Sequence, residues 1–164
     1  MKRQIKKCQK QAELPATHTI KLFGEQMEFD QALIGKCILA AEDNEVNQIV
    51  LEHTLAEQPI PFVMANNGEE AITAWQRLKP LLILMDISMP VINGFQAIEA
   101  IRTVEAEQGL HTPIIALTAH ALKGDKERCL EAGADLYMSK PINPTQLLEQ
   151  IDWLLKHKSE SAVA

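Results

Sequence analysis

Five consecutive large apolar residues occupy positions 81–85, and a carboxylate, Asp86, follows them directly. A run of this length and kind predicts a strand that is buried on both faces, as in a parallel sheet. Burying an unpaired charge costs free energy, so a carboxylate that ends such a strand needs partners. Open α/β sheets place their ligand sites at the carboxyl ends of their strands. This feature therefore predicts an α/β fold with a functional site at Asp86.

Polar side chains follow three further apolar runs in the same manner. Glu42 and Asp43 follow the run 37–41, Thr118 follows the run 114–117, and Lys140 follows the run 136–139. A lone aspartate at the end of a strand is about as often a plain helix cap as a functional residue. The order and the context of all five residues make coincidence a poor explanation. Together they supply three carboxylates, one hydroxyl and one ammonium group.

This set of groups suits phosphoryl chemistry. Three neighbouring carboxylates raise one another's pKa unless a cation lies among them. Hard oxygen ligands with few fixed partners favour Mg²⁺, which keeps some of its waters and bridges to phosphate oxygens. A metal ion, a lysine and a hydroxyl can stabilise a phosphoryl group in transfer, and an aspartate can itself be the nucleophile that forms an acyl phosphate.

Apolar periodicity predicts helices between the strands. The first helix is indicated by a stripe at i, i+3, i+4 and i+7, which consists of Val46, Ile49, Val50 and His53. Five strands that alternate with five helices predict a doubly wound, five-stranded parallel sheet. The flavodoxin-like strand order 2-1-3-4-5 would place the ends of the first and third strands side by side. Glu42, Asp43 and Asp86 would then share one cleft.

The chain from about residue 36 to residue 156 resembles a response-regulator receiver domain. The matching motifs, in the order of the family, lie at residues 38–44, 84–90, 116–119 and 137–141. The resemblance implies that Asp86 accepts a phosphoryl group from a phosphohistidine. It also implies that Glu42, Asp43, Asp86 and the backbone carbonyl of Ser88 surround Mg²⁺, with Mn²⁺ as the alternative cation.

The resemblance assigns roles to further residues. Thr118 and Lys140 would contact the phosphoryl oxygens, and Tyr137 would be an aromatic switch whose ring follows Thr118. Ser88 and His120 each lie two residues after a site residue, and in the family these positions tune hydrolysis of the phosphoryl group. The Lys140–Pro141 peptide bond would be cis.

The expected domain organisation has three parts. Residues 1–35 form a linker or tail that is partly disordered, residues 36–158 form the receiver domain, and residues 159–164 form a flexible C-terminus. The entry into the domain, residues 33–48, is similar to that of receivers in hybrid histidine kinases. A receiver from the C-terminus of a hybrid sensor kinase is therefore the preferred interpretation. A stand-alone response regulator that acts through protein contacts remains the alternative.

The composition of the chain and the motifs that it lacks exclude several classes of binding partner. The net charge of −6 does not favour binding to nucleic acid or to an anionic membrane, and no apolar stretch is long enough to span a membrane. The glycines form no phosphate-binding loop, so the chain is not expected to bind ATP. The phosphoryl group would come from a histidine kinase, or from a kinase core in the same protein, and would pass to a histidine phosphotransfer protein. We expect a cytoplasmic domain. A homodimer through the last helices and a parent protein that is anchored in a membrane are both compatible with the sequence.

Two other function classes compete with a signalling phosphoacceptor. A magnesium-dependent aspartyl phosphatase of the haloacid-dehalogenase type needs a second aspartate two residues after the nucleophile, where this chain has Ser88. A degenerate receiver that only binds proteins would lack the acceptor, the acidic pair or the lysine, and none of these is missing. We therefore expect an acceptor that modifies itself and does not turn over a substrate, although a parent protein could be a kinase.

Overall fold

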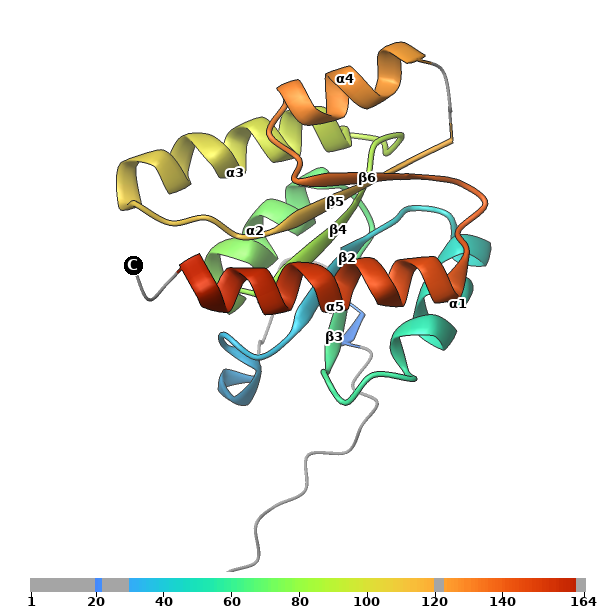
Figure 1. The fold of residues 1–164 in the computed structure, drawn as a ribbon, viewed down its shortest axis with the longest axis horizontal. Helices are drawn as coiled ribbons and strands as arrows, with labels where there is room; N and C mark the ends of the chain where they lie inside the picture. Colours follow the sequence, from blue (N-terminus) through green and yellow to red (C-terminus); the bar gives the residue numbers. More distant parts are fainter. Residues whose placement is uncertain (1–19, 22–29, 120–122, 162–164) are drawn as a thin grey trace, which may run out of the picture.

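A parallel β-sheet lies at the centre of the protein, with helices on both of its faces (Figure 1). The computed structural model describes residues 20–21, 30–119 and 123–161. The strands are β1 (Ile20–Lys21), β2 (Ile38–Ala41), β3 (Phe62–Ala65), β4 (Leu82–Asp86), β5 (Ile114–Thr118) and β6 (Leu136–Ser139). The helices are a 3₁₀ turn η1 (Gln31–Leu33), then α1 (Glu45–Leu55), α2 (Gly68–Leu78), α3 (Gly94–Gln108), α4 (Lys123–Glu131) and α5 (Pro144–Ser161).

The strand order confirms the predicted topology and adds one strand to it. The five main strands run β3-β2-β4-β5-β6, which is the order 2-1-3-4-5, and all neighbouring pairs are parallel. The additional strand, β1, pairs with the outer edge of β3 at Val63 and Met64. The sequence did not predict β1, because two residues carry no periodicity and only the free edge of β3 gives them a partner.

The boundaries of the domain at 36 and 158 remain predictions, but regular secondary structure extends beyond both. Leu33 of η1 has no exposed surface and belongs to the core on one face of the sheet. Helix α5 continues to Ser161. The segment that contains η1, just before β2, therefore packs in the same core as the sheet.

Two apolar layers hold the helices against the sheet. Helices α2, α3 and α4 cover one face, where Trp75, Ile98 and Cys129 are buried. Helices α1 and α5 cover the other face, where Leu51 and Ile151 are buried. Successive residues of β2 to β5 contribute to opposite layers, so these strands are buried on both faces, as their apolar runs predicted.

The cysteines of the described region act as packing residues. Cys37 and Cys129 are free thiols with no exposed surface. Burial raises the pKa of the Cys37 thiol to about 11, because the thiolate would lose its hydration. Both thiols are therefore neutral members of the core rather than ligands or nucleophiles.

Helix α1 is confirmed, but the stripe that predicted it faces solvent. Val46, Ile49 and Val50 are 69%, 57% and 37% exposed. The helix instead packs through a second stripe that includes Leu51 and Leu55, which are fully buried. Both stripes have helical spacing, so the sequence pattern identified the helix without deciding which side meets the sheet.

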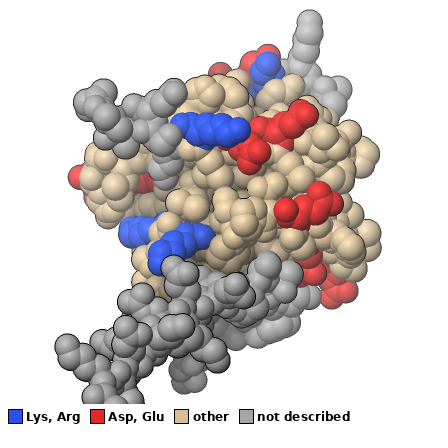
Figure 2. Space-filling model, turned by 60° about the horizontal axis from the view of Figure 1, so that its bottom comes forward, with Lys and Arg blue, Asp and Glu red and all other residues tan. Residues whose placement is uncertain are grey.

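The face of the molecule in Figure 2 shows charged side chains in small groups, with broad uncharged surface between them.

Candidate functional site

The three predicted carboxylates meet at the carboxyl ends of two neighbouring strands. Glu42 follows β2, Asp86 ends β4, and the register pairs Ala41 with Met85. Glu42 is fully buried and Asp86 is 2% exposed, whereas Asp43 is open to solvent. One oxygen from each carboxylate lies within 4.8 Å of the others. This geometry could hold one metal ion, with solvent reaching it from the side of Asp43.

Lys140 supplies the positive charge that lets two buried carboxylates lie side by side. Its Nζ lies 2.6 Å from Glu42 Oε2 and 3.0 Å from Asp86 Oδ2. The side chain of Lys140 is only 14% exposed. Its backbone N–H donates to the Thr118 carbonyl at 2.7 Å, which fixes the start of the side chain beside β5. The Lys140–Pro141 peptide bond is cis, in agreement with the expectation.

Burial in this cluster disfavours the charged form of the Glu42 carboxylate. Burial raises its pKa above the ordinary value, and hydrogen bonds from Lys140 and Asn47 oppose that rise. Asp86 adds a smaller repulsion. The ammonium group and the hydrogen bonds thus compensate for lost hydration, as a bound divalent cation would do more strongly.

Polar residues in α1 and at its N-cap position Glu42, and the sequence did not predict this role. Asn47 Nδ2 donates to Glu42 Oε1 at 3.0 Å. Gln48, which is 4% exposed, donates at 2.6 Å to the Glu42 carbonyl and at 3.0 Å to Asn66 Oδ1. Asn44 caps α1 by accepting from two backbone N–H groups, and its own N–H donates to Glu42 at 3.2 Å. The available signal was the three amides at positions 44, 47 and 48, which closely follow the two acids at 42 and 43.

The loop after Asp86 is shaped around the carboxylate. The Ser88 N–H donates to Asp86 Oδ1 at 3.1 Å, and the Ser88 side chain is exposed. Gly94 begins α3 directly against the backbone of Asp86, where an added Cβ would lie 2.2 Å from the Asp86 carbonyl oxygen. The Gly94 N–H also donates to the Ile87 carbonyl at 3.0 Å.

We expect Gly94→Ala to destabilise the protein by about 1–3 kcal/mol, because the methyl group collides with backbone that cannot rotate away. Urea unfolding followed by circular dichroism measures this loss. Gly124→Ala is the matched control, since no atom lies within 4 Å of an added Cβ there. Equal stability of the two variants would contradict the close approach at Asp86.

The remaining predicted residues surround the cleft or lie outside the described region. Thr118 ends β5 next to β4, with 3% of its surface exposed. Tyr137 lies on β6 opposite Ala116 and packs against the core layer of α2, α3 and α4. His120 falls outside the described residues. The structure thus brings Glu42, Asp43, Asp86 and Lys140 into direct proximity and places Thr118 at the end of the adjacent strand.

The donor set fits a hard divalent cation. All three side chains offer carboxylate oxygens, which Mg²⁺ prefers, and the exposed Asp43 leaves room for retained water. No sulfur or imidazole of the described residues joins this cluster, so softer metals have no advantage here.

Comparison with known proteins agrees with the site and the fold. The family described as the response regulator receiver domain matches residues 38–152. Hybrid signal transduction histidine kinase I of Dictyostelium discoideum is 44% identical over 138 residues, which cover 81% of this chain and 8% of that protein. Sensor protein GacS of Pseudomonas syringae is 38% identical over 115 residues, which cover 70% of this chain and 13% of that protein. The chain thus spans a small part of these two proteins.

A solved structure gives the corresponding likeness in three dimensions. The receiver domain of sensor histidine kinase PA1611 from Pseudomonas aeruginosa has magnesium coordinated in its active-site cleft. It superimposes with a TM-score of 0.67 and 38% sequence identity, covering 74% of this chain and 98% of that domain. Within the described residues, no helix is long and apolar enough to cross a membrane. The matched family, the parallel sheet and the acidic cluster lead to one conclusion: this chain belongs to the response regulator receiver domain family, the receiving module of two-component signalling.

Proposed function

We propose that Asp86 is the phosphoacceptor of this receiver. A carboxylate oxygen of Asp86 attacks the phosphorus of a phosphohistidine, an acyl phosphate O–P bond forms, and the N–P bond to the imidazole breaks. The electron pair of that bond stays on the imidazole nitrogen. The observation that carries the proposal is the pairing of a nearly fully buried Asp86 with Lys140 at 3.0 Å, inside a cluster of three carboxylates.

The surrounding residues would bind the metal ion, contact the phosphoryl oxygens and set the lifetime of the acyl phosphate. Glu42, Asp43 and Asp86 would hold Mg²⁺ together with the Ser88 carbonyl, and the bound cation would offset the charge of the phosphoryl oxygens. Lys140 would move its ammonium group from the carboxylates to a phosphoryl oxygen. The Thr118 hydroxyl would donate to another, and the Tyr137 ring would follow Thr118. The side chains at 88 and 120 would set how long the acyl phosphate survives.

Phosphate uptake from a small donor tests this function. The intact chain is incubated with acetyl phosphate and Mg²⁺, and its mass is measured. One added phosphoryl group, lost on mild base treatment and absent with a chelator, is the expected result. Mn²⁺, which has similar oxygen ligands, is expected to replace Mg²⁺. Repeated turnover of a generic phosphate ester would support the phosphatase alternative instead.

We propose that the donor and the receiving partner dock on the exposed stripe of α1. Val46, Ile49 and Val50 lie on the helix that starts directly beside the cleft, and they form an exposed apolar surface on the described part of the chain. The fold neighbour Ssk1 was solved with the histidine phosphotransfer protein Ypd1, and its receiver is 33% identical to this chain with a TM-score of 0.66. The partners proposed here are therefore a histidine kinase, or a kinase core in the same protein, and a histidine phosphotransfer protein.

Ile49→Asp is expected to slow phosphoryl transfer from a phosphorylated histidine phosphotransfer protein by about tenfold or more, because burying a charge opposes docking. Uptake from acetyl phosphate should not change, since the cleft is untouched. Leu110→Asp serves as the control, because Leu110 is 49% exposed but lies at the far end of α3. Equal slowing by both variants, or equal slowing with both donors, would contradict docking on α1.

Two finer points belong to the same proposal. The domain is proposed to work in the cytoplasm, where its free cysteines stay reduced. We also propose that the domain can signal by forming a homodimer through its last helices. The preferred origin of the chain is a hybrid histidine kinase, and a stand-alone response regulator is the alternative. Sedimentation velocity with and without acetyl phosphate would test the dimer.

A further inference from the structure

The turn from β3 to α2, residues 66–68, lies at the same edge of the sheet as the acidic cluster but supplies none of its three carboxylates. Strand β3 pairs with β2, and beyond the last pair of the ladder the Glu42 N–H donates to the Ala65 carbonyl at 2.9 Å. The turn therefore begins directly after the residue that pairs with Glu42. Its contacts reach two different parts of the cleft.

The first set of contacts joins the turn to Glu42 through Gln48 of α1. The side-chain nitrogen of Gln48 donates to the Glu42 carbonyl at 2.6 Å and to Asn66 Oδ1 at 3.0 Å. A primary amide has two N–H hydrogens, so both are used. Gln48 is 4% exposed, so the loss of either acceptor would leave a buried donor unsatisfied.

The Asn66 side chain is itself held by α2. The backbone N–H and the side-chain amide of Asn66 both donate to Glu70 Oε2, at 2.8 and 2.9 Å. Glu70 Oε1 accepts from Asn67 Nδ2 at 3.2 Å, and Asn67 caps α2 by accepting from the Glu70 N–H at 2.9 Å. These bonds turn the amide nitrogen of Asn66 toward Glu70 and leave its oxygen for Gln48.

The second contact joins the turn to the loop after Asp86. The Gly68 N–H donates to the Ile92 carbonyl at 3.0 Å, and an added Cβ on Gly68 would lie 2.4 Å from that carbonyl oxygen. Ile92 follows Val91, whose φ of 67° lies in the left-handed region. A β-branched residue is disfavoured there and keeps this conformation only where the surrounding structure imposes it. The contact with Gly68 lies directly beside this strained residue.

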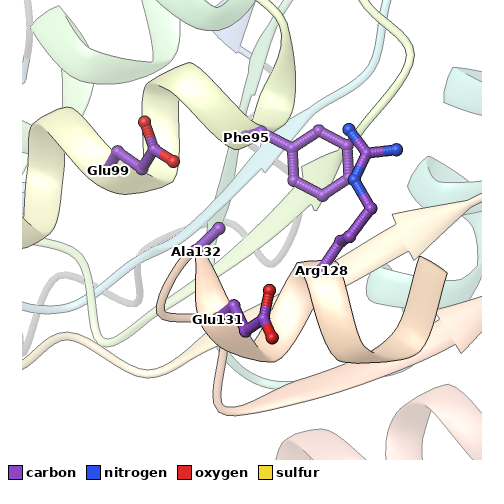
Figure 3. A pocket seen from close by; sticks show the side chains of 5 residues that line it. All are labelled: Phe95, Glu99, Arg128, Glu131 and Ala132. Atoms are coloured by element: carbon purple, nitrogen blue, oxygen red, sulfur yellow. The ribbon is translucent and has the colours of Figure 1, made fainter. Parts of the chain in front are cut away.

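Helix α3 holds the end of the same loop from the other side. Gly94 begins the helix, and the next residue, Phe95, faces α4, where the Arg128 guanidinium lies 4.6 Å from the centroid of its ring (Figure 3). Phe95 and Arg128 line a groove of about 200 Å³ between the two helices. The end of the loop is thus fixed by α2 through Ile92 and by α3, which packs on α4.

We propose that the turn at 66–68 is a positioning element for the magnesium site. On one side it holds Glu42 through Gln48. On the other side Gly68 holds the loop that begins after Asp86. This inference rests on the function proposed above and adds residues that supply none of the metal ligands. Residues that orient metal ligands change metal affinity by about 10- to 100-fold when they are lost, because the ligands are no longer held in place.

A magnesium titration of the whole chain without a phosphodonor, followed by nuclear magnetic resonance, tests the side of Gln48. Gln48→Met keeps the length of the side chain but loses both donors, and it should raise the dissociation constant for Mg²⁺ about tenfold. Thr54→Val is the matched control. Thr54 is a buried polar residue of the same helix, and its hydroxyl donates to the Val50 carbonyl at 2.8 Å, within α1. This control should leave the constant unchanged, whatever its effect on stability.

The same titration tests the side of Gly68. Gly68→Ala should also raise the dissociation constant about tenfold, because the methyl group displaces Ile92 and the loop with it. Gly133→Ala is the control for a general loss of stability. Gly133 has a φ of 108°, an added Cβ would lie 2.8 Å from the Arg102 side chain, and the residue precedes β6 at the opposite edge of the sheet. It should lower the stability in urea unfolding without changing the constant.

Combined variants separate the two sides. Asn66→Ala should add nothing to the effect of Gln48→Met, because Asn66 acts through Gln48, whereas Gly68→Ala should multiply that effect. Unchanged magnesium affinity in Gln48→Met, or an equal loss in Thr54→Val, would overturn the proposal. An additional loss from Asn66→Ala would contradict the connection through Gln48.

Uptake from acetyl phosphate keeps these outcomes apart from failure of the function. At saturating Mg²⁺, Gln48→Met and Gly68→Ala should each still take up one phosphoryl group, since the acceptor and the metal ligands are intact. A parent chain that binds Mg²⁺ but takes up no phosphoryl group would overturn the acceptor role of Asp86, while the titrations would still decide the positioning role. A parent chain that binds no Mg²⁺ would overturn both.

Discussion

Asp86→Asn is expected to abolish phosphoryl uptake, with labelling at least about a hundredfold below that of the parent chain, since the nucleophile itself is lost. An amide oxygen does not attack phosphorus to leave a stable acyl phosphate. The substitution also removes one of three clustered carboxylates and one ionic partner of Lys140, so Mg²⁺ should bind more weakly. Both effects act in the same direction.

Intact mass after incubation with acetyl phosphate and Mg²⁺ measures the uptake, and a magnesium titration followed by Trp fluorescence or nuclear magnetic resonance measures the metal affinity. Asp152→Asn is a suitable control, because this exposed carboxylate of α5 lies outside the cluster. Persistent, base-labile labelling of Asp86→Asn would mean that another residue is the acceptor. The assignment of Asp86 would then be wrong, whatever the effect on the metal.

Lys140→Met is expected to have the second large effect, on stability and on the phosphoryl response together. Two buried carboxylates would lose the ammonium group that lies 2.6 and 3.0 Å from them. Removing one partner of a buried ion pair costs about 3–5 kcal/mol, and the partial access of solvent through the cleft reduces this to about 2–4 kcal/mol. The apolar stem is kept, so the loss reports on charge rather than on packing.

Magnesium should rescue the stability of this variant but not its signalling. A cation that binds the folded chain raises its unfolding free energy, and it should do so more for Lys140→Met than for the parent, because it replaces the missing charge. Phosphoryl uptake should stay impaired even at saturating Mg²⁺. Thermal unfolding over a magnesium titration measures the first effect, with Lys36→Met as the control. A smaller magnesium shift in Lys140→Met than in the parent chain would contradict the role of Lys140 as a stand-in for the cation.

The sequence predicted the strands and the site residues for one reason. In a parallel sheet every carboxyl end lies at the same edge, so polar residues after apolar runs converge once the strand order is known. Asp86 and Glu42 follow this rule directly, and the structure places their oxygens beside that of Asp43. The amides that support Glu42 were missed, because a hydrogen bond such as that of Gln48 to Asn66 depends on the packing of α1 against the neighbouring strand.

Helix α1 shows where periodicity stops being informative. Ile49 and Leu51 belong to different stripes with the same spacing, yet only Leu51 is buried. Period alone locates a helix, whereas the partner surface decides which stripe is covered. The exposed stripe is the one on which we propose that partners dock, so the apolar pattern that indicated the helix also marks the proposed docking surface.

By itself, the sequence determined the alternating fold, the order of the site residues and their convergence at one edge of the sheet, because these follow from local apolar patterns and the geometry of parallel strands. The tertiary structure decided the contacts between distant segments. Lys140 bonds to Glu42 across 98 positions of sequence, and its ammonium group also contacts Asp86. Arg102 joins α3 to the carbonyls of Gly133 and Thr112 at 2.9 and 2.8 Å. Such contacts have no local signature, since the free energy of a buried charge depends on which groups the packed chain places around it.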